Sequence, residues 1–194
     1  MGKLVVTEFV TLDGVFEDPG GSENTAKGGW QIPLMGEDEG EYKLEELQHA
    51  GALLLGRRTY DGFADAWPNM QDTGEFGELM NSIQKYVVTI SISEFKWQNS
   101  KQLGTDLVGN VKQLKKDNEK NILVEGSGEL IRALLEAELV DEIRLMVYPL
   151  VLGEGKRLFE DSPETKFKLV GNRTFQRGTL LLTYSQIVQG KEGA

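Results

Sequence analysis

Cysteine is absent from this sequence of 194 residues, and histidine occurs only once, as His49. Without cysteine the chain has no disulfide framework, no thiol nucleophile and no zinc site built on thiolates, and it suits a reducing compartment. A zinc site would have to consist almost entirely of carboxylates, which is unusual. His49 falls within a predicted helix, where an ordinary helix-face histidine is a simpler interpretation than a catalytic base.

Long apolar runs and blocks of basic residues are missing as well. The apolar stretches at residues 52–55 and 146–152 are far shorter than the ~18–20 residues of a membrane helix. An acid, Glu8, interrupts the N-terminal region before a signal-peptide core can form. The 21 Lys and Arg against 31 Asp and Glu give a net charge of −10, which opposes sequence-independent binding to nucleic acid. We therefore expect a cytoplasmic protein without a membrane or nucleic-acid partner, folded as one domain over residues 1–194.

Segments typical of strands alternate along the chain with segments typical of helices. Strands are predicted over residues 3–12, 52–55, 86–90 and 122–124, and helices over 41–50, 59–67 (capped by Thr59), 75–83, after the cap Asp106, and around 130–135. Three further strands are predicted at 142–152, 166–175 and 179–188, the last two joined by a hairpin at 176–178. This order predicts an α/β fold with a mixed sheet, mostly parallel with a C-terminal antiparallel hairpin, flanked by helices.

Residues 20–41 form the longest stretch without clear periodicity, and they are rich in glycine and acids. Too little chain precedes them for a separate domain, so a long functional loop or lid is a better interpretation than a linker. Trp30 in this stretch either packs over a ligand or anchors the loop. The acidic group is expected on a solvated loop or at the N-terminus of the following helix; it comprises Glu37, Asp38, Glu39 and Glu41.

Two turns have the same design, in which a buried strand leads into a turn that opens a helix. The first is Gly56-Arg57-Arg58-Thr59, after the strand at 52–55. Free backbone N–H groups and the positive end of the helix dipole favour an anion at such a turn. Two guanidinium groups and a hydroxyl would add donors for phosphate. The equally weighted alternative is a strand end with solvated arginines.

The second turn is Gly126-Ser127-Gly128-Glu129, after the strand at 122–124. Its glycines would let a pyrophosphate approach the backbone, although glycine at such a junction often serves packing only. The fingerprint G-x-G-x-x-G is interrupted at Ile131, so this is not a standard Rossmann turn. Because ligands of open α/β sheets lie beyond the carboxyl ends of the strands, two such turns in one sheet favour a dinucleotide.

A third turn, Asp13-Gly14, follows the first strand and precedes the long loop. An aspartate in this position would orient a substrate or a nicotinamide amide. Asp-Gly is also a common turn pair, and the pattern alone slightly favours that simpler interpretation.

Several segments together resemble the dihydrofolate reductase-like superfamily. They are Thr-Leu-Asp-Gly at 11–14, Gly-Arg-Arg-Thr-Tyr at 56–60, Val-Val-Thr at 87–89 and Val-Glu-Gly-Ser-Gly-Glu-Leu at 124–130. The segments at 139–143 and 149–159 are characteristic of one branch, the C-terminal reductase domain of bifunctional riboflavin-biosynthesis proteins. The resemblance extends over roughly residues 3–188.

This resemblance implies a homodimer and NADPH as the hydride donor. Carried over to this sequence, it places the phosphates of the adenosine half on Gly56, Arg57, Arg58 and Thr59. It places Thr89 and Ser91 near the adenosine ribose and its 2′-phosphate, and the second pyrophosphate turn at Gly126, Ser127, Gly128, Glu129 and Leu130. Asp13 would lie beside the nicotinamide and the substrate pocket, as the catalytic residue.

The activity implied by the resemblance is an NADPH-dependent reduction of a small heterocyclic or sugar-derived imine or carbonyl. Reduction of 5-amino-6-(5-phosphoribosylamino)uracil in riboflavin biosynthesis is the specific candidate. The alternatives are dihydrofolate reduction and an NADP(H)-binding protein without turnover. The acid that assists protonation in dihydrofolate reductase has no clear counterpart, and Glu37, Asp38 and Glu41 lie nearby in the sequence.

Overall fold

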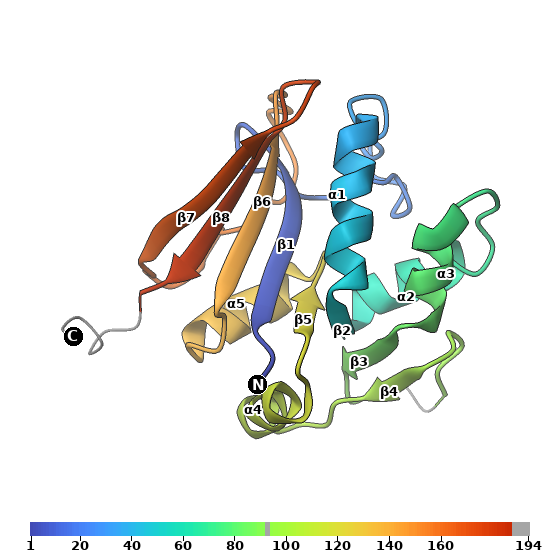
Figure 1. The fold of residues 1–194 in the computed structure, drawn as a ribbon, viewed down its shortest axis with the longest axis vertical. Coiled ribbons are helices and arrows are strands. Elements are labelled where there is room, and N and C mark those ends of the chain that lie inside the picture. The colour runs from blue at the N-terminus through green and yellow to red at the C-terminus, as the bar shows by residue number, and fades with distance from the viewer. Residues whose placement is uncertain (92–93, 188–194) are drawn as a thin grey trace.

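The computed structural model describes residues 1–91 and 94–187. An eight-stranded sheet in the order β4-β3-β2-β5-β1-β6-β8-β7 forms its centre (Figure 1). The strands are β1 (Leu4–Thr11), β2 (Ala50–Gly56), β3 (Gln84–Val88), β4 (Ser100–Gln102), β5 (Asn121–Val124), β6 (Glu142–Tyr148), β7 (Phe167–Thr174) and β8 (Leu180–Gln186). The helices are α1 (Glu37–Gln48), α2 (Arg57–Ala66), α3 (Gly74–Ser82), α4 (Leu107–Asp117) and α5 (Gly128–Glu136).

The strands from β4 to β6 in this order are parallel to their neighbours, whereas β8 is antiparallel to β6, and β7 to β8. In the middle of the sheet, Leu53 pairs with Leu123 of β5, and both side chains are buried. Continuous apolar runs of this kind are expected for parallel strands covered on both faces. The predicted mixed α/β fold with a C-terminal antiparallel hairpin is confirmed.

Helices cover the two faces of the parallel strands (Figure 1). One core cluster contains Leu47 of α1, Tyr60 of α2 and Met80 of α3, and a second contains Val111 of α4 and Ile131 of α5. Because the parallel strands all point the same way, their carboxyl ends lie along one edge of the sheet. We call this the carboxyl edge, and the connections into α2 and α5 start there.

Two helices begin earlier than the sequence pattern predicts. The helix predicted from residue 41 starts at Glu37 after Gly36, and its first turn contains the acids Glu37, Asp38 and Glu39, which favour a helix N-terminus. The helix predicted to be capped by Thr59 starts at Arg57, with Gly56 as its N-cap. The prediction of Thr59 as the cap is therefore wrong, whereas the Asp106 side chain does cap α4, by accepting a hydrogen bond from Gly109 N.

The strand ends also differ from the prediction. β6 stops at Tyr148 rather than at residue 152, since the following Pro149 has no N–H with which to continue the ladder. β4 was not predicted because its three residues, Ser-Lys-Gln, carry no apolar pattern. The hairpin strand predicted to end at Val188 ends at Gln186, and Val188 lies outside the described residues.

The long connection between β1 and α1 is ordered by its own polar contacts. Both carboxylate oxygens of Asp18 accept hydrogen bonds, from Glu23 N at 2.9 Å and from Thr25 N at 3.0 Å. Trp30 is buried, donates to the carbonyl oxygen of Glu17 at 2.9 Å and packs edge-on against Tyr148. Of the two interpretations of Trp30, the structure therefore supports the loop anchor.

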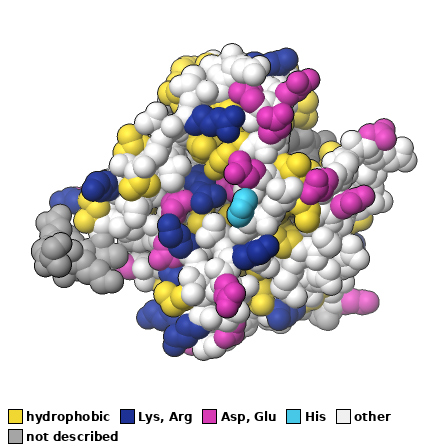
Figure 2. Space-filling view, viewed as in Figure 1, with side chains coloured by type: hydrophobic (Ala, Val, Ile, Leu, Met, Phe, Trp, Pro, Cys, Tyr) yellow, Lys and Arg dark blue, Asp and Glu magenta, His cyan; other side chains and the backbone are white. Residues whose placement is uncertain are grey.

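Membrane insertion of a helix is not indicated: within the ranges 1–91 and 94–187, none of the helices is both long and apolar enough to span a bilayer. Acidic and basic side chains are interspersed on the face shown in Figure 2.

Candidate functional site

The two glycine turns predicted from the sequence lie side by side at the carboxyl edge and are joined by hydrogen bonds. Gly56 N donates to Ser127 Oγ at 2.9 Å, and Thr59 Oγ1 donates to the carbonyl oxygen of Gly126 at 2.9 Å. The hydroxyls of Ser127 and Thr59 are 3.0 Å apart. The start of α2 and the start of α5 therefore form one unit, although 67 positions separate Thr59 from Gly126.

Neither of these helix starts is capped by a side chain, since the N-cap residues Gly56 and Ser127 make no side-chain capping bond. The backbone N–H groups of a first helical turn have no partner within the helix, and they bind anions readily. Gly126 has φ +64°, and a Cβ there would lie 3.0 Å from Thr59 Cγ2. At Gly128 a Cβ would lie 2.6 Å from the Phe16 ring. The unit formed by the starts of α2 and α5 therefore depends on glycine at both positions.

Arg57 and Arg58 extend from this unit toward solvent, with side chains 44% and 67% exposed. Arg57 forms an ion pair with Asp61, with 2.6 Å between Nε and Oδ2, and its Nη1 donates to Ser91 Oγ at 2.9 Å. Arg58 pairs with Glu23 of the long loop at 2.9 Å. Both guanidinium groups are therefore held close to the turn by exposed partners that an anionic ligand can replace.

The remaining predicted cofactor residues fall into two groups. Thr89 and Ser91 follow β3, the neighbour of β2, and Ser91 N donates to Thr89 Oγ1 at 3.2 Å. The hydrogen bond from Arg57 to Ser91 connects this pair to the glycine unit. Glu129 is exposed in the first turn of α5. The side chain of Leu130 is buried in the core, which leaves only its backbone for a ligand.

Asp13 lies after β1 at the same edge, and internal donors engage its carboxylate. Oδ1 accepts from the Thr11 hydroxyl at 2.7 Å and from Leu152 N at 3.1 Å, while Oδ2 accepts from Gly153 N at 2.9 Å. The Thr11 hydroxyl, followed by Gly153 N, lowers the pKa of Asp13 to about 2. Asp13 is therefore ionised near neutral pH, when it can orient or polarise a ligand but cannot donate a proton.

A buried network of charges, which sequence reasoning missed, joins α1 to the ends of the central strands. Lys43 Nζ lies 2.5 Å from Glu46 Oε2, 2.9 Å from Glu125 Oε1 and 3.3 Å from the Thr7 hydroxyl. Burial alone would lower the pKa of Lys43, but Glu125 and Glu46 hold it well above its ordinary value. Arg144 completes the network at 3.1 Å from Glu46. Lys43 therefore remains charged next to Glu125, the residue before the second glycine turn.

Glu39 lies in the first turn of α1, as one of the two interpretations of the acidic group predicted. It is fully buried rather than solvated, and its Oε2 accepts a hydrogen bond of 2.7 Å from the Tyr148 hydroxyl. Its Oε1 has no hydrogen-bond partner among the residues that the structure describes. The available signal was the spacing of Glu39, Lys43 and Glu46, which places three charged side chains on one face of a helix.

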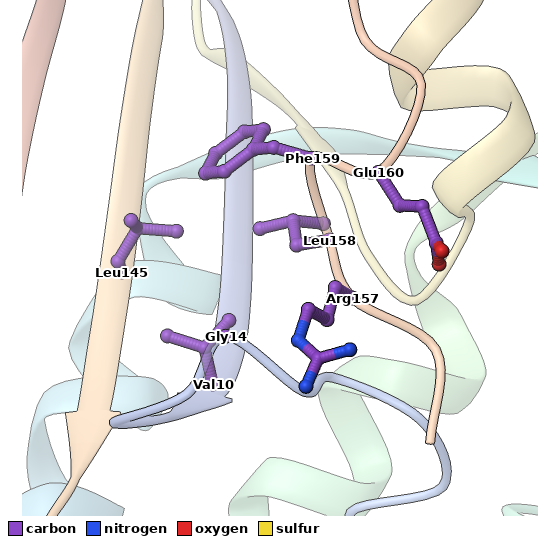
Figure 3. A pocket seen from close by; sticks show the side chains of 7 residues that line it. All are labelled: Val10, Gly14, Leu145, Arg157, Leu158, Phe159 and Glu160. Atoms are coloured by element: carbon purple, nitrogen blue, oxygen red, sulfur yellow. The ribbon is translucent and has the colours of Figure 1, made fainter. Parts of the chain in front are cut away.

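A hollow of about 380 Å³ lies on the opposite side of β1 from α1 (Figure 3). Its lining is mainly apolar and comprises Val10, Gly14, Leu145, Arg157, Leu158, Phe159 and Glu160. Arg157 Nε donates to the carbonyl oxygen of Asp13 at 3.0 Å, so the rim of the hollow is connected to the turn after β1.

A family profile described as the RibD C-terminal domain matches residues 2–181. Protein YyaP of Bacillus subtilis (strain 168), which is described as uncharacterized, is 32% identical over 186 residues, or 94% of each chain.

Two solved structures share the fold at low sequence identity. A putative riboflavin biosynthesis protein from Shewanella sp. PV-4 superposes with a TM-score of 0.75 at 19% identity, over 97% of this chain and 100% of that one. Dihydrofolate reductase from Enterococcus faecalis, solved as a complex with NADP(H), superposes with a TM-score of 0.60 at 15% identity, over 95% and 96% of the two chains.

Proposed function

We propose that this chain, which belongs to the RibD C-terminal domain family, is an NADPH-dependent reductase of a small heterocyclic or sugar-derived imine or carbonyl. The observation that carries the proposal is the hydrogen-bonded unit of Gly56, Thr59, Gly126 and Ser127, which brings two uncapped helix starts together. A fold of this kind is shared by many activities, so the site rather than the fold has to support the function.

The residues at the carboxyl edge fit a dinucleotide with phosphates. The N–H groups at the starts of α2 and α5 provide neutral donors, and Arg57 and Arg58 provide positive charge. Thr89 and Ser91 supply hydroxyls on the adenosine side, next to Arg57. When bound, NADPH supplies the hydride, and the chain supplies binding, orientation and electrostatics.

The residues beyond the glycine unit are suited to holding a polar substrate. Asp13 offers a fixed negative charge at the end of β1, and the Lys43–Glu125 pair places charged groups beside the second turn. A pyrimidine or pterin ring carries both hydrogen-bond donors and acceptors, so charges of both signs suit this substrate class. We propose the ribosylaminopyrimidine of riboflavin biosynthesis as the first substrate to test, and we place the reaction in the cytoplasm, within one domain spanning the chain.

We further propose that two copies of the chain pair through β6, β8 and β7. Leu145 and Leu182 are register partners on this part of the sheet, and Leu169 lies opposite Tyr184. Leu169 and Leu180 are 47% and 40% exposed, and exposed large apolar side chains that gather on one part of a sheet favour an interface there. Sedimentation should give a dimer, and Leu169→Lys should give a monomer; a wild-type monomer at all concentrations would contradict this.

The experiment for the proposed function follows the consumption of NADPH by the purified protein. It is mixed in turn with the ribosylaminopyrimidine, dihydrofolate and simple carbonyl compounds, and the reduced products are identified by mass spectrometry. We expect turnover with a pyrimidine acceptor and loss of turnover with Asp13→Ala. Binding of NADPH without oxidation by any acceptor would identify a binding protein instead, and the absence of binding would refute the proposal.

A further inference from the structure

Glu8 is a buried acid of β1 that touches the second glycine turn directly. Its side chain accepts a hydrogen bond from Gly126 N, with 2.5 Å between the nitrogen and Oε1, and the residue is 7% exposed. On the other side of the same glycine, the Gly126 carbonyl oxygen accepts from Thr59. Glu8 of β1 therefore fixes the peptide group before Gly126, and Thr59 of α2 fixes the peptide group after it.

The cations around Glu8 are paired with other acids. Ion pairs in the adjoining network connect the cations Lys3, Lys43 and Arg144 with the acids Glu46, Glu125 and Glu142. Glu8 makes no ion pair within residues 1–91 and 94–187, and its polar partner there is the neutral Gly126 N–H. Glu125 faces it from the end of β5, and Glu46 and Lys43 face it from α1. Burial, followed by the charge of Glu125, raises the pKa of Glu8 well above its ordinary value.

We propose that Glu8, in its protonated form, is the positioning residue of the second phosphate turn, and that its ionisation weakens dinucleotide binding. This inference rests on the proposed NADPH function. A neutral carboxyl group holds Gly126 N through its carbonyl oxygen and adds no charge next to the start of α5. An ionised carboxylate would place a second negative charge beside Glu125, at a turn that has to accept an anion. The ordinary role of a buried acid as an ion-pair partner does not account for this arrangement.

The test compares the wild type with Glu8→Gln and Glu8→Ala. Glutamine keeps the acceptor for Gly126 N and cannot ionise, whereas alanine removes the acceptor. Glu136→Gln, at an exposed position near the end of α5, is the matched control for loss of one acid. Dissociation constants for NADPH are measured by tryptophan fluorescence from pH 6 to pH 9, and thermal unfolding of each variant verifies that it is folded.

We expect NADPH affinity of the wild type and of Glu136→Gln to fall about fivefold or more as the pH rises, which corresponds to about 1 kcal/mol. Glu8→Gln should keep the low-pH affinity of the wild type with a much flatter profile. Glu8→Ala should bind more weakly at every pH. Equal pH profiles for Glu8→Gln and the wild type, or wild-type affinity in Glu8→Ala, would overturn the inference.

A second readout separates this inference from the proposed function. The amide signal of Gly126 in ¹⁵N-labelled protein without any ligand reports directly on its hydrogen bond to Glu8. We expect this signal to shift with pH in the wild type and not in Glu8→Gln. If the wild type bound no NADPH at any pH, the proposed function would fail while the Gly126 titration still reported on Glu8. A Gly126 signal with the same pH dependence in both proteins would refute the role of Glu8.

Discussion

Replacing Arg57 and Arg58 together with alanine should weaken NADPH binding about thirtyfold. A hydrogen bond to a charged group contributes about 1.5–3 kcal/mol net, and we take this as the gross contribution of each guanidinium group to NADPH binding. Each must first give up an exposed partner, Asp61 for Arg57 and Glu23 for Arg58, and such surface pairs contribute about 0.2–1 kcal/mol. About 1 kcal/mol then remains for each arginine, and 2 kcal/mol corresponds to a factor of about 30 in the dissociation constant.

The assay is a titration with NADPH followed by tryptophan fluorescence, at low and at physiological salt. The matched control is Lys112→Ala with Lys116→Ala, which removes the same charge from exposed positions of α4. We expect wild-type affinity in the control and a smaller dependence on salt in the double arginine variant. If the arginine variant bound NADPH within a factor of two of the wild type, the phosphate assignment would be refuted. Arg57 and Arg58 would then be solvated residues at a strand end.

Three other results are expected. Gly126→Ala should destabilise the protein by about 1–2 kcal/mol in chemical unfolding and reduce NADPH affinity. The positive φ of this position is strained for alanine, and the added Cβ would meet Thr59. Normal stability and affinity would contradict this. Burial lowers the pKa of Lys85 from 10.5 to about 8, so the folded state holds fewer protons than the unfolded state between these pH values, and the free energy of unfolding should rise by about 3 kcal/mol across them. Lys85→Met should abolish that rise in denaturant titrations, and an unchanged pH profile would refute the assignment. Asp13→Asn should speed hydrogen exchange at Gly153 N, and the wild type should lose the same protection only as the pH falls through about 2, where Asp13 takes up a proton in the folded state.

The fold follows from the sequence wherever a long apolar pattern marks an element. The runs at Leu53–Leu55 and Ile122–Val124 are buried on both faces of the sheet, and the stripe of Ile131 and Leu134 buries one side of α5. These elements could be predicted because the burial of apolar side chains contributes most of their stability. β4 was missed because its three polar residues are fixed by pairing with β3 and not by burial.

Part of the candidate site could likewise be predicted from the sequence, and part could not. Gly56 ends the buried strand β2 and Gly126 lies two residues after the buried strand β5, so their meeting at one edge could be predicted from the parallel order alone. The contact from Lys43 to Glu125 spans 82 positions, and that from Glu8 to Gly126 spans 118. No local pattern encodes such contacts, because they depend on which strands become neighbours and on the register between them.

The most direct test of the NADPH site is a titration of ¹⁵N-labelled protein with NADPH, followed by amide chemical shifts. The account predicts saturable changes concentrated in residues 56–59, 89–91 and 126–130, with smaller changes near Asp13. NADH should cause weaker changes around Ser91 if the 2′-phosphate lies there. Shifts concentrated elsewhere, or none at saturating NADPH, would contradict the claim that these two glycine turns form one dinucleotide site.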